Sequence, residues 1–315
     1  MKTSAASRSG SSVSPQQKKA DQAYLRAVKS FSGFLEGVGK SPATIECYLR
    51  DLKTFRRFFL HDLAKLGVKD LDSYPEFLKK EGFRVNTRRR QMLTVRSFLR
   101  YLRTRKKLQV DLASRVPSFE RSERIPHTFE VEELRQRIQA LPATTEIETR
   151  NRAVLWVLLE TGCQVSELPR LREKNILSSS SGPRVRLGDW DQGVEREVPV
   201  SSEMVEAVKA LTYLQWSRRS RSSRSGSEAG YLFEGFNKFG PMGCITPRGI
   251  ELLVKHYAIQ FKTPQMKPRN LRHSIVIHWL ESGVPLEEVR ERLGLKSDYA
   301  LRLYRAMIEA REGSS

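Results

Sequence analysis

The fold is decided by two stretches of this sequence, TGCQVSEL at residues 161–168 and RNLRHSIVIHWLESGVPLEEVRERLGLKSDYALRLY at residues 269–304. The first comes directly after the apolar run 153–159, which favours a buried helix, and Thr161-Gly162 is typical of the turn that ends one. Apolar residues recur at helical spacing in and just beyond the second stretch. They predict helices over 271–282, 286–293 and 298–310.

The sequence around these stretches predicts a mainly α-helical domain with a small β-sheet over residues 129–315. Further helices are expected at 130–140, 148–160 and 246–261. Two short β-like runs, at 184–187 and 196–200, flank Gly188-Asp189-Trp190-Asp191-Gln192-Gly193, so we expect a hairpin there. The tract 217–227 is nearly all Ser and Arg, and it predicts a mobile loop.

The first third of the chain predicts an all-α unit. Residues 21–110 hold four helical patterns in which aromatic and aliphatic residues recur every three or four positions. Ser41-Pro42 begins one of them, with serine as the N-cap and proline at the first helical position. Residues 1–20 are mostly small and polar and predict a disordered tail. Residues 111–128, with two prolines and several charges, predict a linker.

Charge is the most informative feature of the composition. Lys and Arg total 56 against 36 Asp and Glu, which gives the 315 residues a formal net charge of +20. The isoelectric point of about 10.1 lies above the value of ~9 that marks nucleic-acid-binding domains. The helix expected over 86–104 concentrates cations on one face, which favours contacts with DNA phosphates over a merely solvated basic face. Its candidate DNA-binding residues are Arg88, Arg89, Arg96 and Arg100.

Several protein classes are disfavoured. The longest apolar run is far shorter than the ~20 residues of a membrane span, and the N-terminus has no apolar signal-peptide core. Cys47, Cys163 and Cys244 are too widely spaced for a disulfide framework or a CxxC metal site, and they suit a reducing cytoplasm. There is no P-loop, no GxGxxG and no paired histidine ligand, so we expect no metal and no cofactor. The composition favours a cytoplasmic protein that binds double-stranded DNA and no membrane.

The two stretches resemble the tyrosine recombinase (phage integrase) family, whose patterns are TGxRxSEL, HxLRH, LGHxS and a tyrosine nine residues beyond the LGH histidine. The step from Leu295 to Tyr304 is the same nine residues. The resemblance extends to the first domain through SPAT at 41–44 and NTRR at 86–89, and it spans residues 21–305. It implies an N-terminal helical core-binding (SAM-like) DNA-binding domain and a C-terminal catalytic-type domain. This layout is similar to that of the Xer recombinases of bacterial chromosomes.

The resemblance also implies a reaction. A tyrosine hydroxyl attacks a DNA phosphodiester and forms a 3′-phosphotyrosyl link, which the 5′-hydroxyl of another strand later resolves. Two arginines bind the non-bridging oxygens, where charge develops in the transition state, and a hairpin lysine and histidines assist proton transfer. The covalent link stores the phosphodiester energy, so no cofactor is required. Tyr304 and Arg272 match the pattern and are the candidate catalytic residues, whereas His273 corresponds to a packing residue.

Four of the six expected catalytic positions are substituted. Gln164 replaces the first arginine, Arg269 the first histidine, and Leu295 the histidine of LGH. Asp191 stands near the position of the lysine, in a hairpin turn that contains no lysine. Glutamine lacks the charged planar fork of arginine, and losing one transition-state donor costs about 10²–10³ in rate. The sequence therefore predicts impaired strand cleavage.

Three functions compete at this point. The first is a family member that binds DNA, or a recombinase partner on DNA, without cutting it. The second is an active recombinase in which Tyr304 still forms the phosphotyrosyl link with relocated helper groups, for which Lys267, Lys296 and Arg170 are candidates. The third is a non-catalytic basic scaffold that binds nucleic acid. In the first two cases a homo-oligomer on DNA is also an option.

Overall fold

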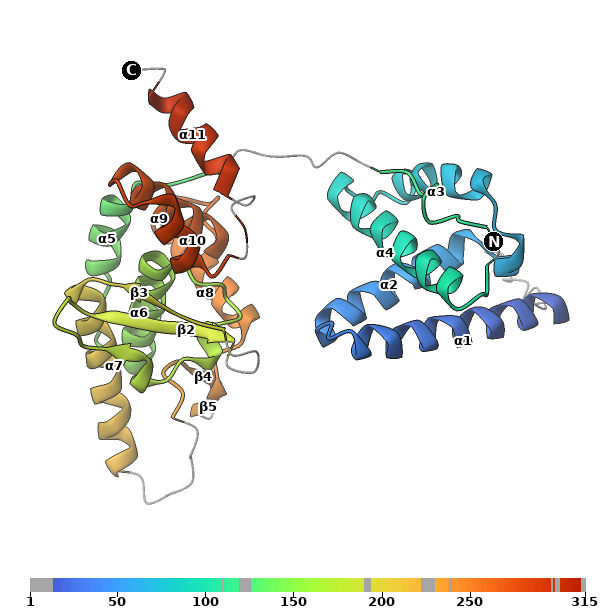
Figure 1. Cartoon of the computed structure of the whole chain (residues 1–315). Coiled ribbons are helices and arrows are strands. Elements are labelled where there is room, and N and C mark those ends of the chain that lie inside the picture. The colour runs from blue at the N-terminus through green and yellow to red at the C-terminus, as the bar shows by residue number, and fades with distance from the viewer. Residues whose placement is uncertain are drawn as a thin grey trace, which may run out of the picture. The chain divides into compact units, whose positions relative to one another are not determined.

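A computed structural model describes residues 14–108, 110–118, 126–189, 194–221, 230–237, 240–295, 297 and 301–312 of the chain. The chain divides into two compact units, Met1–Arg124 and Ile125–Ser315, and each has its own hydrophobic core. Figure 1 labels the helices of both units and four of the strands of the second unit, and it colours the chain from its N-terminus to its C-terminus.

Four helices form the first unit. They are α1 (Pro15–Gly37), α2 (Pro42–Phe58), α3 (Val68–Lys80) and α4 (Val85–Thr104), with the 3-10 turn η1 (Leu63–Lys65) between α2 and α3. Ser14 and Ser41 cap the first two helices, because each serine side chain accepts a backbone N–H of the first turn and a proline follows it. The helices enclose an aromatic core that includes Phe31, Phe55, Tyr74 and Phe98. The four helices expected from the sequence are confirmed.

Helix α1 begins earlier than the sequence pattern predicts. The expected disordered tail covers residues 1–20, but residues 15–20 form the first turns of α1 and Ala20 is buried. The polar composition conceals the start of the helix, although Ser14-Pro15 is the same Ser-Pro signal that opens α2. Residues 1–13 lie outside the described residues.

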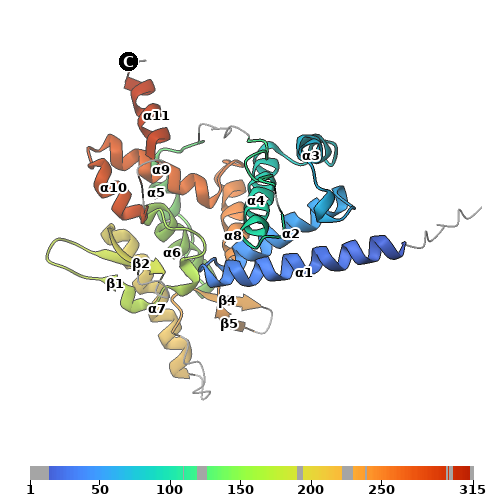
Figure 2. The same ribbon diagram turned by 45° about the vertical axis from the view of Figure 1, so that its right-hand side comes forward.

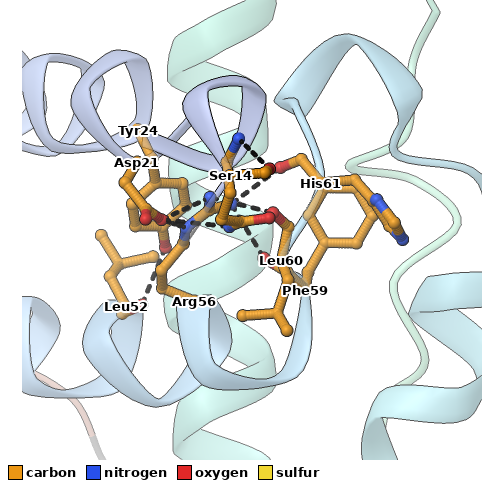
Figure 3. A network of polar contacts seen from close by, with 9 residues as sticks. Ser14, Asp21, Tyr24, Leu52, Arg56, Phe59, Leu60 and His61 are labelled. Atoms are coloured by element: carbon orange, nitrogen blue, oxygen red, sulfur yellow. Dashed lines mark hydrogen bonds and ion pairs between the residues drawn. The ribbon is translucent and has the colours of Figure 1, made fainter. Parts of the chain in front are cut away.

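A polar network joins the start of α1 to the end of α2 (Figure 3). Arg56 of α2 donates from Nε (2.8 Å) and Nη2 (2.6 Å) to Oδ1 of Asp21 on α1, and its Nη1 donates to carbonyl groups just beyond α2. The same guanidinium lies over the ring of Tyr24, whose hydroxyl donates to the Leu52 carbonyl at 2.8 Å. The network thus satisfies exposed carbonyls at the end of α2 while it ties the two helices together.

Residues 110–118 pack onto the first unit instead of forming a linker. Three of their apolar side chains are buried in its core, those of Leu112, Ala113 and Val116. In addition, Arg96 of α4 donates from Nη2 to the Val116 carbonyl at 2.7 Å. The linker expected over 111–128 therefore includes residues that belong to the first unit. Three apolar residues are too few to show a helical or strand periodicity in the sequence, but they are enough to cover the edge of a hydrophobic core. Residues 119–125 lie outside the described part of the chain.

The second unit is built around α6 (Glu146–Thr161). Every residue from Ala153 to Thr161 is buried, since other elements surround this helix. Its neighbours are α5 (Val131–Gln139), α7 (Ser202–Arg221), α8 (Pro247–Gln260) and α9 (Pro268–Glu281). Helices α10 (Leu286–Leu293) and α11 (Arg302–Glu312) pack on α9 at one end of the unit (Figure 2).

Two small antiparallel sheets complete the second unit. One has the order β1 (Ile176–Leu177), β2 (Arg184–Asp189), β3 (Val194–Pro199), and the other pairs β4 (Glu234–Asn237) with β5 (Gly240–Cys244). Val185 lies opposite Val198 and Leu187 opposite Arg196, and the three aliphatic side chains are fully buried. The antiparallel pairing expected from the two β-like runs is confirmed. The turn residues 190–193 lie outside the described residues.

Helix α7 is absent from the sequence-based expectation. A mobile loop is expected at 217–227, whereas α7 continues through the first part of this tract. Apolar residues do recur at helical spacing before it, and they are buried: Met204, Val208 and Leu211. The last turn is held by ion pairs from Arg218 and Arg219 to Glu234 of β4, which no local window of sequence reveals. Residues 222–229 lie outside the described part.

Candidate active site

The site begins where α6 ends. Gly162 adopts a left-handed conformation (φ 57°, ψ 23°) that closes the helix. A Cβ at this position would lie 3.1 Å from Cγ2 of Ile275 on α9, so both the left-handed turn and the close approach of the two helices favour glycine.

Arg272 on α9 connects three chain segments. Its Nη1 donates to the Gly162 carbonyl, and its Nη2 donates to the Leu293 carbonyl at the end of α10 at 3.2 Å. Burial, with a smaller contribution from nearby Arg196, lowers the pKa of Arg272 from its usual value. The guanidinium therefore holds the ends of α6 and α10 against α9, and it is a structural element as well as a candidate catalytic group.

A second arginine lies beside this connection. Arg196 of β3 forms a two-pronged ion pair with Glu167, Nη1 to Oε1 at 2.6 Å and Nη2 to Oε2 at 3.0 Å, and its Nε donates to the Arg292 carbonyl at 2.7 Å. Glu167 also accepts the backbone N–H of Gln164 at 2.6 Å. A Cβ on Gly294 would lie 3.3 Å from Cδ and Nη1 of Arg196, so a side chain there would have to displace the arginine by a few tenths of an ångström.

A cleft of about 670 Å³ opens next to these contacts. Four of the sequence-predicted positions line it together: Gln164, Lys267, Arg269 and Arg272. Two more cations share its wall, Arg248 and Lys255. Glu251 is the acidic residue among the lining side chains, and it pairs with Arg248 at 2.9 Å. This excess of cations in a concave site suits an anion such as a phosphate.

Tyr304 lies on α11 and is 7% exposed. Its hydroxyl is hydrogen-bonded to Nδ1 of His273, and Nε2 of the same ring accepts Nε–H of Arg269 at 3.1 Å. Burial raises the pKa of Tyr304. Burial and the adjacent cations Arg269 and Arg272 lower the pKa of His273 to about 4, so this ring is uncharged at neutral pH. The candidate nucleophile Tyr304 and the substituted position Arg269 thus lie on opposite sides of one histidine.

Sequence reasoning missed the contacts of His273. The family resemblance implies a packing residue there, whereas the ring lies between Arg269 and Tyr304. One signal was available, because Arg269 and His273 are four residues apart and such residues face each other on a helix. The contact with Tyr304 spans 31 positions and has no local signature.

The other sequence-predicted positions differ in where they lie. Leu295 is half-buried against the core, and its backbone N–H donates to the Arg290 carbonyl at 3.0 Å. Lys267 lines the cleft, whereas Arg170 is exposed at the end of η2 (Leu168–Arg170). The predicted positions Asp191 and Lys296 lie outside the described residues.

The candidate DNA-binding arginines all lie on α4 of the first unit. Arg88 and Arg89 are half-buried and Arg100 is exposed, while Arg96 donates to a backbone carbonyl. Within the described part of the chain, Arg89 and Arg100 form no hydrogen bond or ion pair. These two are the cations of the set that the unit itself does not use.

Comparison with known families assigns both units. Residues 127–311 match the phage integrase family, and residues 28–106 match the phage integrase N-terminal SAM-like domain. The chain belongs to the phage integrase family. This membership confirms the resemblance and the expected fold class, a mainly helical protein with small sheets, an N-terminal SAM-like domain and a C-terminal catalytic-type domain.

Relatives of the phage integrase family match over most of the chain. Tyrosine recombinase XerC of Lacticaseibacillus casei is 29% identical over 293 residues, covering 89% of this chain and 93% of the relative. XerC of Natranaerobius thermophilus is 26% identical over 288 residues, covering 89% and 94%. Among solved structures, XerH bound to its difH substrate aligns with a TM-score of 0.65 at 17% identity, over 96% of this chain and 90% of that one. A lambda integrase dimer bound to a COC′ core site aligns at 0.63 and 13% identity, over 94% and 82%.

Two further observations concern the described residues alone. They contain no group of three or more His, Cys, Asp or Glu side chains arranged to hold a metal ion. None of their helices has the length and apolar character needed to cross a membrane.

Proposed function

We propose that this chain binds double-stranded DNA and acts in site-specific recombination in the cytoplasm, and that its own strand cleavage is impaired. The observation that carries the proposal is Gln164, an uncharged side chain on the wall of a cationic cleft, where the family pattern has arginine. The relatives are named tyrosine recombinases, and the aligned XerH and lambda integrase structures carry a difH substrate and a COC′ core site. These names support DNA as the substrate class of this chain.

The chemistry of the cleft supports impaired cleavage. Arg272 donates one N–H from each terminal nitrogen to a backbone carbonyl, so part of its donor set is committed to the fold. Gln164 supplies no second charged fork, and an absent transition-state donor costs about 10²–10³ in rate. Tyr304 is buried and its pKa is raised, which makes its phenolate costly to form. Together these features favour DNA binding over rapid cutting.

Binding of duplex DNA is supported by unused cations on α4. Changing Arg89 and Arg100 to Ala removes two cations, so the slope of log affinity against log salt concentration should become shallower by about 2. The exposed Lys69 and Lys80 of α3 form the matched control, because they carry the same charge on another helix. Fluorescence anisotropy of labelled duplex DNA from 50 to 200 mM salt measures both pairs. Equal slopes for the two double variants would contradict a role for α4.

A second candidate function is an active recombinase with relocated helper groups. One observation favours it: Arg269 lines the same cleft as Arg272, and within the described part of the chain its Nη atoms have no partner. This arginine would supply the second fork that Gln164 lacks. The basic-scaffold alternative is disfavoured because both units match the phage integrase family. We also propose assembly as a homo-oligomer, or with a recombinase partner, on DNA, since the aligned lambda integrase is a DNA-bound dimer.

A covalent trapping assay separates the two candidates. A binding site is first selected from random duplexes, and a nicked version of it then serves as a suicide substrate. We expect no protein–DNA adduct from the native chain and none from Tyr304→Phe, with DNA binding intact in both. An adduct that forms with the native chain and disappears in Tyr304→Phe would overturn impaired cleavage. Gln164→Arg then tests the cause, because a restored second fork should raise any residual adduct yield.

A further inference from the structure

Three side chains form a line beside the cleft. Arg269 and His273 lie one turn apart on α9, and Tyr304 reaches the far side of the imidazole from α11. Nε of Arg269 is 3.1 Å from Nε2 of His273, while Nδ1 of His273 is hydrogen-bonded to the Tyr304 hydroxyl. Both ring nitrogens are therefore hydrogen-bonded. The two partners differ, because arginine can only donate a hydrogen bond whereas a tyrosine hydroxyl can donate or accept one.

The chemistry of arginine fixes the direction of these hydrogen bonds. A guanidinium has N–H donors and no acceptor, so Nε2 of His273 must present its lone pair to Arg269. In a neutral imidazole the single N–H then sits on Nδ1, which must donate to the hydroxyl oxygen of Tyr304. The imidazole is neutral at physiological pH because burial and the adjacent cations Arg269 and Arg272 lower its pKa to about 4.

The geometry points to Arg269 as a positioning residue that fixes His273 in the tautomer protonated at Nδ1, so that Tyr304 is held as a hydrogen-bond acceptor. The inference deepens the proposed function and rests on it only in treating Tyr304 as the reacting group. Arg269, at a substituted position, would thereby act on Tyr304 indirectly, through the imidazole of His273.

The consequence for proton transfer follows directly. If Tyr304 attacks phosphorus, the Oη–P bond forms, the P–O5′ bond breaks, and the phenol proton passes through solvent to the leaving 5′-oxygen. His273 does not receive that proton, because Nδ1 already carries one and Nε2 is held by Arg269. The Nδ1–H group instead stabilises the negative charge that develops on the tyrosine oxygen. Arg269 thus makes the histidine a donor to the nucleophile and prevents it from acting as its base.

The tautomer can be read directly by NMR. Full-length protein labelled with ¹⁵N-histidine gives long-range ¹H–¹⁵N spectra without DNA at pH 7, and His273→Gln identifies the relevant ring among the five histidines. We expect an unprotonated Nε2 and a protonated Nδ1 in the native chain. Arg269→Glu replaces the donor with an acceptor and should reverse the pattern, because a carboxylate accepts Nε2–H.

Lys267→Glu is the matched control, since Lys267 lines the same cleft and makes the same charge change. It should leave the tautomer as it is in the native chain. Arg269→Leu is a second test that adds no charge: the native preference should be lost, and the His273 pKa should rise by about 1 unit or more. A native ring protonated at Nε2, or an unchanged tautomer in both Arg269 variants, would overturn the inference. The spectra contain no DNA, so they stand apart from any result on cleavage.

Discussion

Replacing Glu167 with glutamine should destabilise the second unit through the charge left on Arg196. The paired side chains are 11% and 15% exposed, so the ion pair is largely removed from water. Glutamine keeps the shape of glutamate but leaves the guanidinium without a counter-charge, and breaking a fully buried pair costs about 3–5 kcal/mol. Arg196 retains its bond to the Arg292 carbonyl and some solvent contact. We therefore expect a loss of about 2–3 kcal/mol in the free energy of unfolding.

The assay can be confined to the second unit. All four tryptophans lie there, at positions 156, 190, 216 and 279, so urea unfolding followed by tryptophan fluorescence does not report on the first unit. A loss of this size lowers the urea midpoint by about 1 M. Glu197→Gln is the control, because its ion pair with Arg186 on the same hairpin is 39–41% exposed and should matter by less than about 0.5 kcal/mol.

A third variant tests the cause of the effect. Adding Arg196→Met to Glu167→Gln removes the isolated charge, so the double variant should recover part of the lost stability. The reasoning is refuted if Glu167→Gln unfolds at the same urea concentration as Glu197→Gln. It is also refuted if the free energy of unfolding lost by the double variant equals the sum of the losses in Glu167→Gln and Arg196→Met alone.

Two further predictions concern the same unit. Gly162→Ala should cost about 1–3 kcal/mol. Gly283→Ala, with a positive φ of 80° but no atom near its Cβ, should cost only the backbone part, about 1–2 kcal/mol, and equal urea midpoints for the two variants would contradict the packing argument. His273 has a folded pKa of about 4, below its unfolded value of 6.5, so it binds fewer protons when folded and its stabilising contribution is lost as pH falls from about 6.5 to 4. Because the ring is part-exposed, His273→Gln should remove at most about 1–2 kcal/mol of this pH dependence, measured as urea midpoints at pH 7 and pH 4.5, and an unchanged dependence would contradict the assigned shift.

The sequence locates the motif residues better than it locates their contacts. Gln164, Arg269 and Arg272 are found through the resemblance to the family's motifs, and the structure brings them to one cleft. The bond between His273 and Tyr304 could not be foreseen, because which helix faces meet depends on how α9 and α11 pack. The pairing of residues 167 and 196 is hidden for the same reason, since it joins a turn to a strand 29 positions away.

Sequence-based predictions of helix boundaries fail where contacts with residues far along the chain determine where a helix begins or ends. The Ser/Arg tract after position 217 has the composition of a loop, but its first residues are held in α7 by ion pairs with Glu146 and Glu234. The start of α1 was missed because polar residues dominate its first turn, although Gln17 finds a partner in the Leu60 carbonyl at 2.6 Å. Composition describes a segment in isolation, whereas these ends are fixed by other parts of the chain.

The hydrogen bonds from Arg272 to two backbone carbonyls determine which of the motif positions can be substituted without loss of the fold. Removing that guanidinium would leave two acceptors and the ends of two helices without partners, so the arginine is required whether or not any phosphate is ever attacked. The side chain at position 164 has no such role, because it is exposed and only the backbone N–H and carbonyl of this residue bond to Glu167. A lineage under no selection for catalysis would therefore be free to vary at position 164 long before position 272. An arginine retained at position 272 in such a protein is thus explained by its role in folding, and it says little about whether the protein still cuts DNA.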